Sequence, residues 1–311
     1  MYINELEKLS IKELSEYLRA INDKNQKESI DSLRSYLPKE SQIVSRETIE
    51  NRLLRNLIKD YYNRLDLEKV KEEFLVKGLL NRNQKLEKGL PKDILIYGLE
   101  LLPADYTPGI NLCPKAGTCK DSCLAFSGFA RYQSFDSSEK ELTLNVVLKA
   151  RARRTFLFKN DRKFFEEILK MEIESNAFKA KKANTRTFFR LNVFSDINFT
   201  KLIKELPEIS FYDYTKDWKR SSFSNYHLTY SSSEKVSEKD ILSKLESGSN
   251  VAMVFPKVLP EFFKGVKVIN GDINDLRVYD SNSVIVGLTL KGTIGSKSKK
   301  VNSFSESSSL L

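Results

Sequence analysis

From about residue 92 onward, strand-like and helix-like patterns alternate along the chain, and this alternation limits the possible folds more than any other feature. Seven stretches rich in β-branched and aromatic residues have the pattern of strands. They are 93–103, 185–195, 209–215, 226–232, 250–256, 265–269 and 283–290. Most are separated by helical stretches or crossover segments, which is typical of parallel strands covered by helices. We therefore predict an α/β fold whose sheet closes into a full or partial (β/α) barrel.

These patterns divide the chain into three segments. Residues 1–80 have leucines at helical spacing and no chemical motif, so we expect an N-terminal helical extension that is a candidate docking surface. Residues 81–294 form the predicted α/β domain, with helices expected at 137–160, 161–178, 198–208 and 237–247. Residues 295–311 are rich in serine and lysine, and we expect them to be disordered.

The composition is that of a globular protein with a moderate excess of basic residues. Of 311 residues, 40% are hydrophobic, and 52 lysines and arginines stand against 42 acids. The excess permits contact with nucleic acid, but many basic residues alternate with acids, as in 68–77, which is typical of solvated helix faces. No apolar run is long enough for a bilayer, and the start of the chain has acids and no apolar leader. We therefore expect a cytoplasmic protein with no membrane partner.

All three cysteines of the chain lie in one short segment that follows the first predicted strand. Cys113, Cys119 and Cys123 fall within eleven residues. An odd number of cysteines in a protein expected to be cytoplasmic argues against a disulfide framework. Free thiols without a metal are the other possibility, but exposed ones are vulnerable to oxidation. Three thiols so close together indicate a metal or cluster site.

A [4Fe–4S] cluster fits this ligand set better than zinc does. Structural zinc usually takes four ligands, and the chain has no fourth cysteine. The single histidine, His227, lies in a predicted strand about a hundred residues later, so zinc would need a carboxylate such as Asp121. Iron–sulfur clusters are held by thiolates, and three of them leave one iron open to a further ligand. Zinc stays open as the alternative.

The position of the cysteine segment resembles that in radical S-adenosylmethionine (SAM) enzymes. There the open iron binds SAM, and the cysteine loop follows the first strand of a (β/α) barrel, as the cysteines do here. The spacing differs, since this chain has C-x5-C-x3-C and those enzymes have C-x3-C-x2-C. The analogy is therefore one of fold, and SAM is its implied cofactor.

Polar residues follow nearly every predicted strand of the alternating region. Ligands of parallel barrels lie at the carboxyl ends of strands, so we predict a polar pocket beside the cysteines. Its candidate cofactor-binding residues are Asn192, Ser195, Asp196, Asp213, Lys216, Ser232, Glu234, Lys257, Asp272 and Arg277. Carboxylates such as Asp196 and Glu234 would bind the amino or ribose groups of SAM, and the cations would bind a carboxylate or phosphate.

Each of these residues also has a structural explanation. Asp196 could cap the next helix, 270–275 has ordinary turn chemistry, and Arg277 could pair with Asp275 on the surface. A separate basic segment at 149–163 carries Arg151, Arg153 and Arg154 near Phe158, a mixture that suits a nucleic-acid backbone. An equally good interpretation is that these arginines pair with acids or hold the cysteine segment.

Several motifs in fixed order resemble one known family. The stretch YGLELLPADYTPGINLCPKAGTCKDSCLAFSGFARY at 97–132 is similar to the start of the phage gene product 88 domain. Further similar stretches follow at 150–165, 189–199, 211–216, 225–234, 251–257, 268–280 and 284–292, so the resemblance covers roughly residues 80–294. It implies a phage, prophage or plasmid origin, and thus the host cytoplasm, and it implies no particular activity.

Two hypotheses of function follow. The first is a phage or mobile-element iron–sulfur protein, with a radical-SAM-like enzyme as its more specific form, whose substrate is a nucleotide, a nucleic acid or a host protein. The second is a non-enzymatic nucleic-acid-binding protein with a structural zinc or cluster site. The chain has no Walker A loop, G-x-G-x-x-G, H-E-x-x-H or G-x-S-x-G motif that would favour another class.

Overall fold

The computed structural model describes residues 46–126, 134–136, 141–256 and 258–289. The helices are Arg46–Asn63 (α4), Leu67–Lys77 (α5), Gln84–Glu87 (α6), Val146–Asn160 (α7), Arg162–Lys182 (α8), Thr200–Lys204 (α9) and Glu238–Glu246 (α10), with the short 3-10 helices Gly117–Ser122 (η2) and Leu124–Phe126 (η3). The strands are Leu80–Asn81 (β1), Ile94–Leu99 (β2), Ser134–Asp136 (β3), Glu141–Thr143 (β4), Arg186–Arg190 (β5), Ser210–Thr215 (β6), Tyr226–Ser231 (β7), Asn250–Phe255 (β8), Phe262–Phe263 (β9), Val266–Asn270 (β10) and Ile285–Thr289 (β11).

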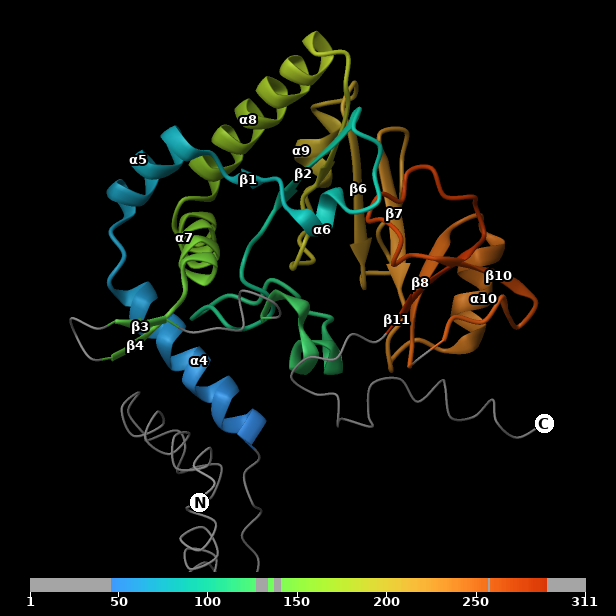
Figure 1. The fold of residues 1–311 in the computed structure, drawn as a ribbon, viewed down its shortest axis with the longest axis horizontal. Helices are drawn as coiled ribbons and strands as arrows, with labels where there is room; N and C mark the ends of the chain where they lie inside the picture. Colours follow the sequence, from blue (N-terminus) through green and yellow to red (C-terminus); the bar gives the residue numbers. More distant parts are fainter. Residues whose placement is uncertain (1–45, 127–133, 137–140, 257, 290–311) are drawn as a thin grey trace, which may run out of the picture.

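A nine-stranded, mostly parallel sheet organises the described part of the chain (Figure 1). Its order is β1-β2-β5-β6-β7-β8-β11-β10-β9. All neighbours from β2 to β10 are parallel, and the two-residue strands β1 and β9 add antiparallel edges. The seven parallel strands lie within or beside the seven predicted stretches, so the α/β prediction is confirmed.

The sheet is open, and the expected closure into a full barrel is not observed among the described residues. Its two edges, β1 and β9, are not paired with each other. The order of the last strands explains this, because β11 returns between β8 and β10 instead of continuing around toward β2. The last parallel strand, β11, therefore lies inside the sheet, and the two edges are formed by the two-residue strands β1 and β9.

Alternate residues of the strands point to opposite faces of the sheet, and each face has its own hydrophobic core. Phe189 and Phe211 face a large core that includes Phe165 and Ile173 of α8 and Leu245 of α10. The neighbouring Phe188 and Tyr212 face a smaller core with Leu86 of α6 and Leu276. Burial on both faces explains why these strands are nearly continuous apolar runs. None of the described helices has the length and apolar character needed to cross a bilayer.

The described part of the predicted N-terminal extension packs on the rest of the molecule. Leu53, Leu57 and Ile58 of α4 share a buried cluster with Leu148 and Ala152 of α7. Val70 and Phe74 of α5 belong to the main core. The remaining helices that we predict within residues 1–45, the tail 295–311 and Lys257 lie outside the described residues.

The predicted helix 137–160 begins later than its sequence pattern suggests. Residues Glu141–Thr143 form β4, which pairs with β3 in a separate two-stranded sheet. Helix α7 begins at Val146, because the side chain of Asn145 accepts a hydrogen bond from the Leu148 N–H at 2.9 Å and caps the first turn. The part of the predicted helix at 141–145 therefore precedes α7, and 137–140 lie outside the described residues.

Candidate functional site

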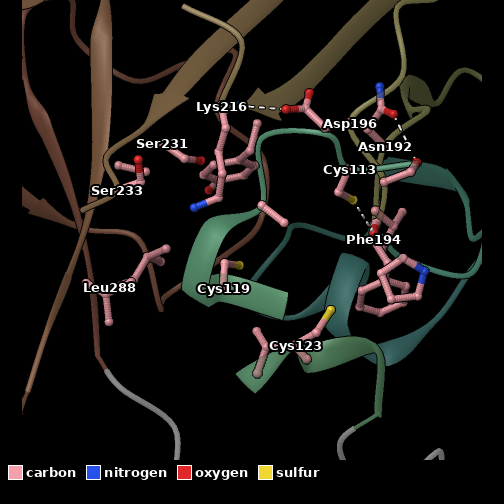
Figure 2. A pocket seen from close by; sticks show the side chains of 18 of the residues that line it. Cys113, Cys119, Cys123, Asn192, Phe194, Asp196, Lys216, Ser231, Ser233 and Leu288 are labelled. Carbon is pink, nitrogen blue, oxygen red and sulfur yellow. Dashed lines mark hydrogen bonds between the residues drawn. The ribbon is translucent and has the colours of Figure 1, made fainter. Parts of the chain in front are cut away.

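A cavity of about 370 Å³ lies where the parallel strands end. Its wall combines residues that follow β5, β6, β7 and β10 with the cysteine segment that follows β2 (Figure 2). Cys113, Cys119 and Cys123 all line it. Parallel strands have their carboxyl ends at one edge, so topology alone gathers these segments. The volume is within the range of small-molecule sites.

The cysteine segment forms compact turns that need one glycine. The Ala116 N–H donates to the Cys113 carbonyl at 3.0 Å, and the Cys119 N–H donates to the Ala116 carbonyl at 3.1 Å. Helix η2 begins at Gly117, whose φ is +55°. This backbone conformation favours glycine, and a Cβ there would lie 2.0 Å from Oε1 of Glu234 and displace that carboxylate from its present position.

Three hydrogen-bonded contacts fasten this segment to the strand ends. The Thr118 N–H and hydroxyl donate to the Glu234 carboxylate at 3.0 and 3.1 Å. Lys115 forms an ion pair with Asp217 at 2.7 Å. The Asp196 N–H donates to the carbonyl of Leu112 at 2.8 Å. The cysteines are thus positioned by the segments that follow β5, β6 and β7.

The three thiols differ in exposure. Cys113 and Cys123 are half-buried, whereas Cys119 is exposed. The Cys113 thiol donates a hydrogen bond to the Phe194 carbonyl at 3.3 Å. Burial raises the pKa of Cys113 to about 12, and nearby Cys123 and Cys119 add to this while the Ala104 backbone and Lys216 oppose it. Cys113 must therefore lose a proton on binding a metal.

The donor chemistry fits a thiolate-held group, but the donors are not drawn together. Within the described residues, no three histidine, cysteine, aspartate or glutamate side chains form a ready metal-binding group. Figure 2 shows the three sulfur atoms on the cavity wall, on turns of one segment. A bound group would have to bring these turns closer to one another.

The structure brings most of the predicted strand-end residues to this cavity. Those that line it are Asn192, Ser195, Asp196, Lys216, Ser232, Glu234 and Asp272. Asp213 and Arg277 lie behind the wall, where they are 0% and 2% exposed. Lys257 is not among the described residues.

Asp196 serves the protein's own backbone and side chains. Its carboxylate accepts hydrogen bonds from the Arg220 guanidinium, from the Thr215 hydroxyl at 2.9 Å and from the Lys216 N–H at 2.8 Å. The Arg220 side chain is 6% exposed, so this ion pair is buried. Asp196 therefore shapes the cavity by holding the end of β6.

Asn192 and Asp213 form a second internal network. Asp213 accepts from the Asn192 N–H at 2.7 Å, from the Asn192 amide at 3.1 Å and from the Tyr226 hydroxyl at 3.0 Å. Ser195 donates to the Asn192 amide oxygen at 3.0 Å. Burial raises the pKa of Asp213 to about 6, although the hydrogen bonds and Arg190 oppose this shift. The network fixes the turn that follows β5.

The residues near β10 are also internally paired. Asp272 accepts from the N–H and hydroxyl of Thr289 at 2.8 and 2.5 Å, which joins the ends of β10 and β11. Arg277 pairs with Asp280 at 3.0 Å and donates to the Asn274 carbonyl at 2.7 Å. It is 2% exposed, so the suggestion that it forms a surface ion pair is wrong.

Arg190 is a cavity residue that the sequence analysis missed. It ends β5, and its Nη1 lies 2.6 and 2.7 Å from the two carboxylate oxygens of Asp275. The Tyr212 hydroxyl donates to the same carboxylate at 2.8 Å. An arginine that ends the apolar run TFFR is the signal that could have identified it, because a charge inside a buried strand needs a partner.

Lys216 differs from the other predicted charged residues because its ammonium group has no protein partner among the described residues. The side chain is half-buried and lines the cavity (Figure 2). Across the part of the chain that the structure describes, no hydrogen bond or ion pair to its ammonium group is formed. Its positive charge opposes the rise in the pKa of Cys113 and contributes to the lowered pKa of Glu234. The charge of Lys216 therefore acts on both sides of the cavity. Lys216 can therefore receive an anionic group of a ligand.

The three arginines proposed for nucleic acid are engaged inside the protein. Arg151 is 7% exposed, pairs with Glu100 at 2.7 Å and donates to the Ala125 carbonyl of the cysteine segment. Arg153 pairs with Glu73 at 2.8 Å. Arg154, which is 7% exposed, donates to Asn81 at 2.8 Å. This placement favours the second interpretation, since Arg151 and Arg153 pair with acids and Arg151 also holds the cysteine segment.

His227 does not belong to the cysteine cavity. It lies within β7, its Nε2 is buried, and burial lowers its pKa, an effect to which the charge of Arg277 adds. It is not among the residues that line the cavity. A zinc ion at the cysteines would thus need its fourth ligand from elsewhere.

Comparison with known proteins gives one match. A family model described as "Gene product 88" matches residues 76–303, well over half of the chain. No curated protein and no solved structure matches the sequence.

Proposed function

Because the chain belongs to the gene product 88 family, whose description states no activity, we propose its function from the cavity itself. We propose an iron–sulfur protein that holds a [4Fe–4S] cluster on Cys113, Cys119 and Cys123 and binds a small polar molecule beside it. The observation that carries this proposal is that all three thiols line one cavity together with the polar strand ends.

The ligand count supports a cluster that reacts with something in the cavity. Three thiolates leave one iron of a [4Fe–4S] cluster without a protein ligand. SAM is the small molecule that we propose, in a radical-SAM-like enzyme, because the cysteines follow β2, the first parallel strand, at the carboxyl edge of the sheet. When bound, the cluster would supply the electron for reductive cleavage of SAM.

The chain's own residues have separable roles in this proposal. The cysteines hold the cluster after losing their protons. Asp196, Asn192 and Asp213 keep the strand ends in place through their hydrogen bonds to the protein. Lys216 binds the carboxylate of the ligand by a charge-assisted hydrogen bond. The proposed setting is the reducing cytoplasm of a phage host, where thiols stay free.

Addition of SAM to the anaerobically reduced protein tests the proposal. We expect SAM to change the electron paramagnetic resonance spectrum of the cluster and to be cleaved. Replacement of Lys216 by alanine should weaken SAM binding by about tenfold or more, since a charge-assisted hydrogen bond contributes about 1.5–3 kcal/mol. Lys163→Ala, at a side chain 89% exposed on α8, is the matched control.

The opposite results would separate the alternatives. If the electron paramagnetic resonance spectrum of the cluster does not change when SAM is added, the radical-SAM assignment is contradicted and the protein is an iron–sulfur protein of another kind. A protein with one zinc ion and no iron would favour the second hypothesis, a nucleic-acid-binding protein with a structural metal site.

A further inference from the structure

We propose that a second cavity next to the cysteines binds the phosphate groups of a nucleotide. This cavity, the lysine groove, has a volume of about 630 Å³. Its defining residues are Lys115, Lys216, Lys235, Lys244, Trp218 and Ser233. It combines cations, a hydroxyl group and an aromatic ring in one concave surface.

The charge in the lysine groove is positive and only partly neutralised. Lys115 pairs with Asp217 at 2.7 Å, and Lys244 donates to the Trp218 carbonyl at 3.3 Å. Among the described residues, nothing pairs with the ammonium groups of Lys216 and Lys235. Asp240, the acidic residue in the wall, accepts a hydrogen bond from the Ser237 hydroxyl at 2.5 Å as part of the N-terminal cap of α10. An anion in the groove would thus meet two cations that no acid among the described residues neutralises, and Lys216 would be shared with the ligand of the cysteine cavity.

Trp218 gives the groove a rigid aromatic wall. Its indole N–H donates to the Ser231 carbonyl at 3.1 Å, and its ring packs against Tyr230 with centroids 5.8 Å apart. Aromatic side chains beside cations are the combination that binds the bases and phosphates of nucleotides and single strands. This chemistry favours a nucleotide over a simple anion.

The groove and the cysteine cavity share part of their walls. Lys216 and Ser233 line both of them. A nucleotide with its phosphates on the lysines would therefore lie next to the cysteines. This inference rests on the proposed function where it names the substrate class, but nucleotide binding itself needs no cluster.

Two sources could supply the same chemistry, a free nucleotide or a single-stranded nucleic acid. Both offer a phosphate and a base, and the groove contacts would be shared. They differ in salt dependence, because a strand neutralises several lysines at once and loses affinity steeply as salt rises. The test therefore uses both.

Trp218 is the chain's single tryptophan, so its fluorescence reports on the groove. Adenosine monophosphate, adenosine, inorganic phosphate and an oligonucleotide of about ten nucleotides are titrated at low and high salt. Calorimetry measures the same affinities in case the fluorescence does not change. Each titration is repeated on Cys119→Ser, so that a failed cluster hypothesis leaves the groove result readable.

We expect the monophosphate to bind more tightly than adenosine or inorganic phosphate. Lys235→Ala and Lys216→Ala should each weaken it about tenfold, as loss of a charged hydrogen bond does, and Lys163→Ala should not. If the oligonucleotide binds much more tightly than the monophosphate and its affinity falls steeply with salt, the ligand is a single strand. If the two affinities are equal, the ligand is a free nucleotide. The proposal is overturned if neither phosphate-bearing nucleotide binds, if adenosine or phosphate binds as well, or if both lysine variants bind normally.

Discussion

At the scale of single residues, the charged groups around the cavity divide into those that hold the wall and those that face a ligand. Asp196 and Asp213 accept hydrogen bonds from the N–H groups of Lys216 and Asn192, which follow β6 and β5. Glu234 accepts one from the Thr118 N–H of the cysteine segment. Arg151 reaches from α7 to the cysteine segment. Lys216, in contrast, presents its charge to the cavity. A buried carboxylate with several protein donors is a positioning residue, because a ligand would have to displace those donors.

Replacement of Arg151 by alanine should destabilise the protein by about 3–5 kcal/mol, because it leaves Glu100 buried without its cation. Urea unfolding measures this loss. Lys163→Ala is the control and should change the free energy of unfolding by about 0.5 kcal/mol at most. A loss for Arg151→Ala as small as the control's would show that the buried pair contributes little.

The buried Asp213 predicts an unusual pH dependence. Burial raises its folded pKa from 3.8 to about 6, so the folded state binds the proton more tightly than the unfolded state does. Its contribution to the free energy of unfolding is then fully present below its unfolded pKa and is lost as pH rises through about 6. The unfolding free energy of the wild type minus that of Asp213→Asn should therefore fall as pH rises through this range, because asparagine does not titrate. A difference that grows with pH would contradict this account.

At the scale of elements, the cysteine segment is a loop whose shape depends on three strand ends. Thr118 is tied to Glu234 after β7, Lys115 to Asp217 after β6, and Leu112 to Asp196 after β5. Gly117, which has no Cβ, leaves room for the Glu234 carboxylate in the first of these contacts. The segment carries little regular structure of its own, so its geometry follows from the sheet.

Replacement of Glu234 by alanine should loosen η2. The Thr118 N–H loses its acceptor, so its hydrogen exchange should accelerate, by about tenfold for a lost hydrogen bond of about 1.4 kcal/mol. Exchange followed by nuclear magnetic resonance measures this. Thr118→Ser keeps the hydroxyl and is the conservative control. Unchanged exchange in Glu234→Ala would mean that the turns of the segment suffice to hold it.

Sequence patterns predict individual elements well and their arrangement less well. The seven parallel strands and the gathering of polar residues at their ends follow from hydrophobic runs and from parallel topology. The return of β11 between β8 and β10 could not be predicted, since it depends on how the chain crosses the sheet. Two-residue strands such as β1 have no pattern of their own. The site residue Arg190 was hidden inside a strand run.

At the scale of the whole molecule, the described N-terminal helices belong to the same packing as the cysteine segment. The apolar face of α4 shares a cluster with Ala125, Phe126, Cys113 and Cys123. The family match, however, begins at residue 76 and so leaves out α4 and all but the last two residues of α5. In this chain the cysteine segment therefore rests partly on residues that precede the matched region.

Replacement of Leu57 in α4 by alanine should cost about 2–5 kcal/mol, as a buried leucine does, because its side chain is 4% exposed in that cluster. It should also speed the alkylation of Cys123, which packs on the same cluster. Chemical unfolding and mass spectrometry measure the two effects. Lys59→Ala, on the exposed face of the same helix, should show neither. A fully stable Leu57→Ala protein would indicate that α4 is a separable extension.

The central claim, that three thiolates hold a [4Fe–4S] cluster, is tested most directly by counting metals in protein purified without oxygen. Iron, acid-labile sulfide and zinc are measured for wild type and for the Cys113→Ser, Cys119→Ser and Cys123→Ser variants. The account predicts about four irons and four sulfides per wild-type chain, with a visible absorbance, and a loss of both in each variant. Stoichiometric zinc without iron, or iron content that does not depend on the three cysteines, would contradict it.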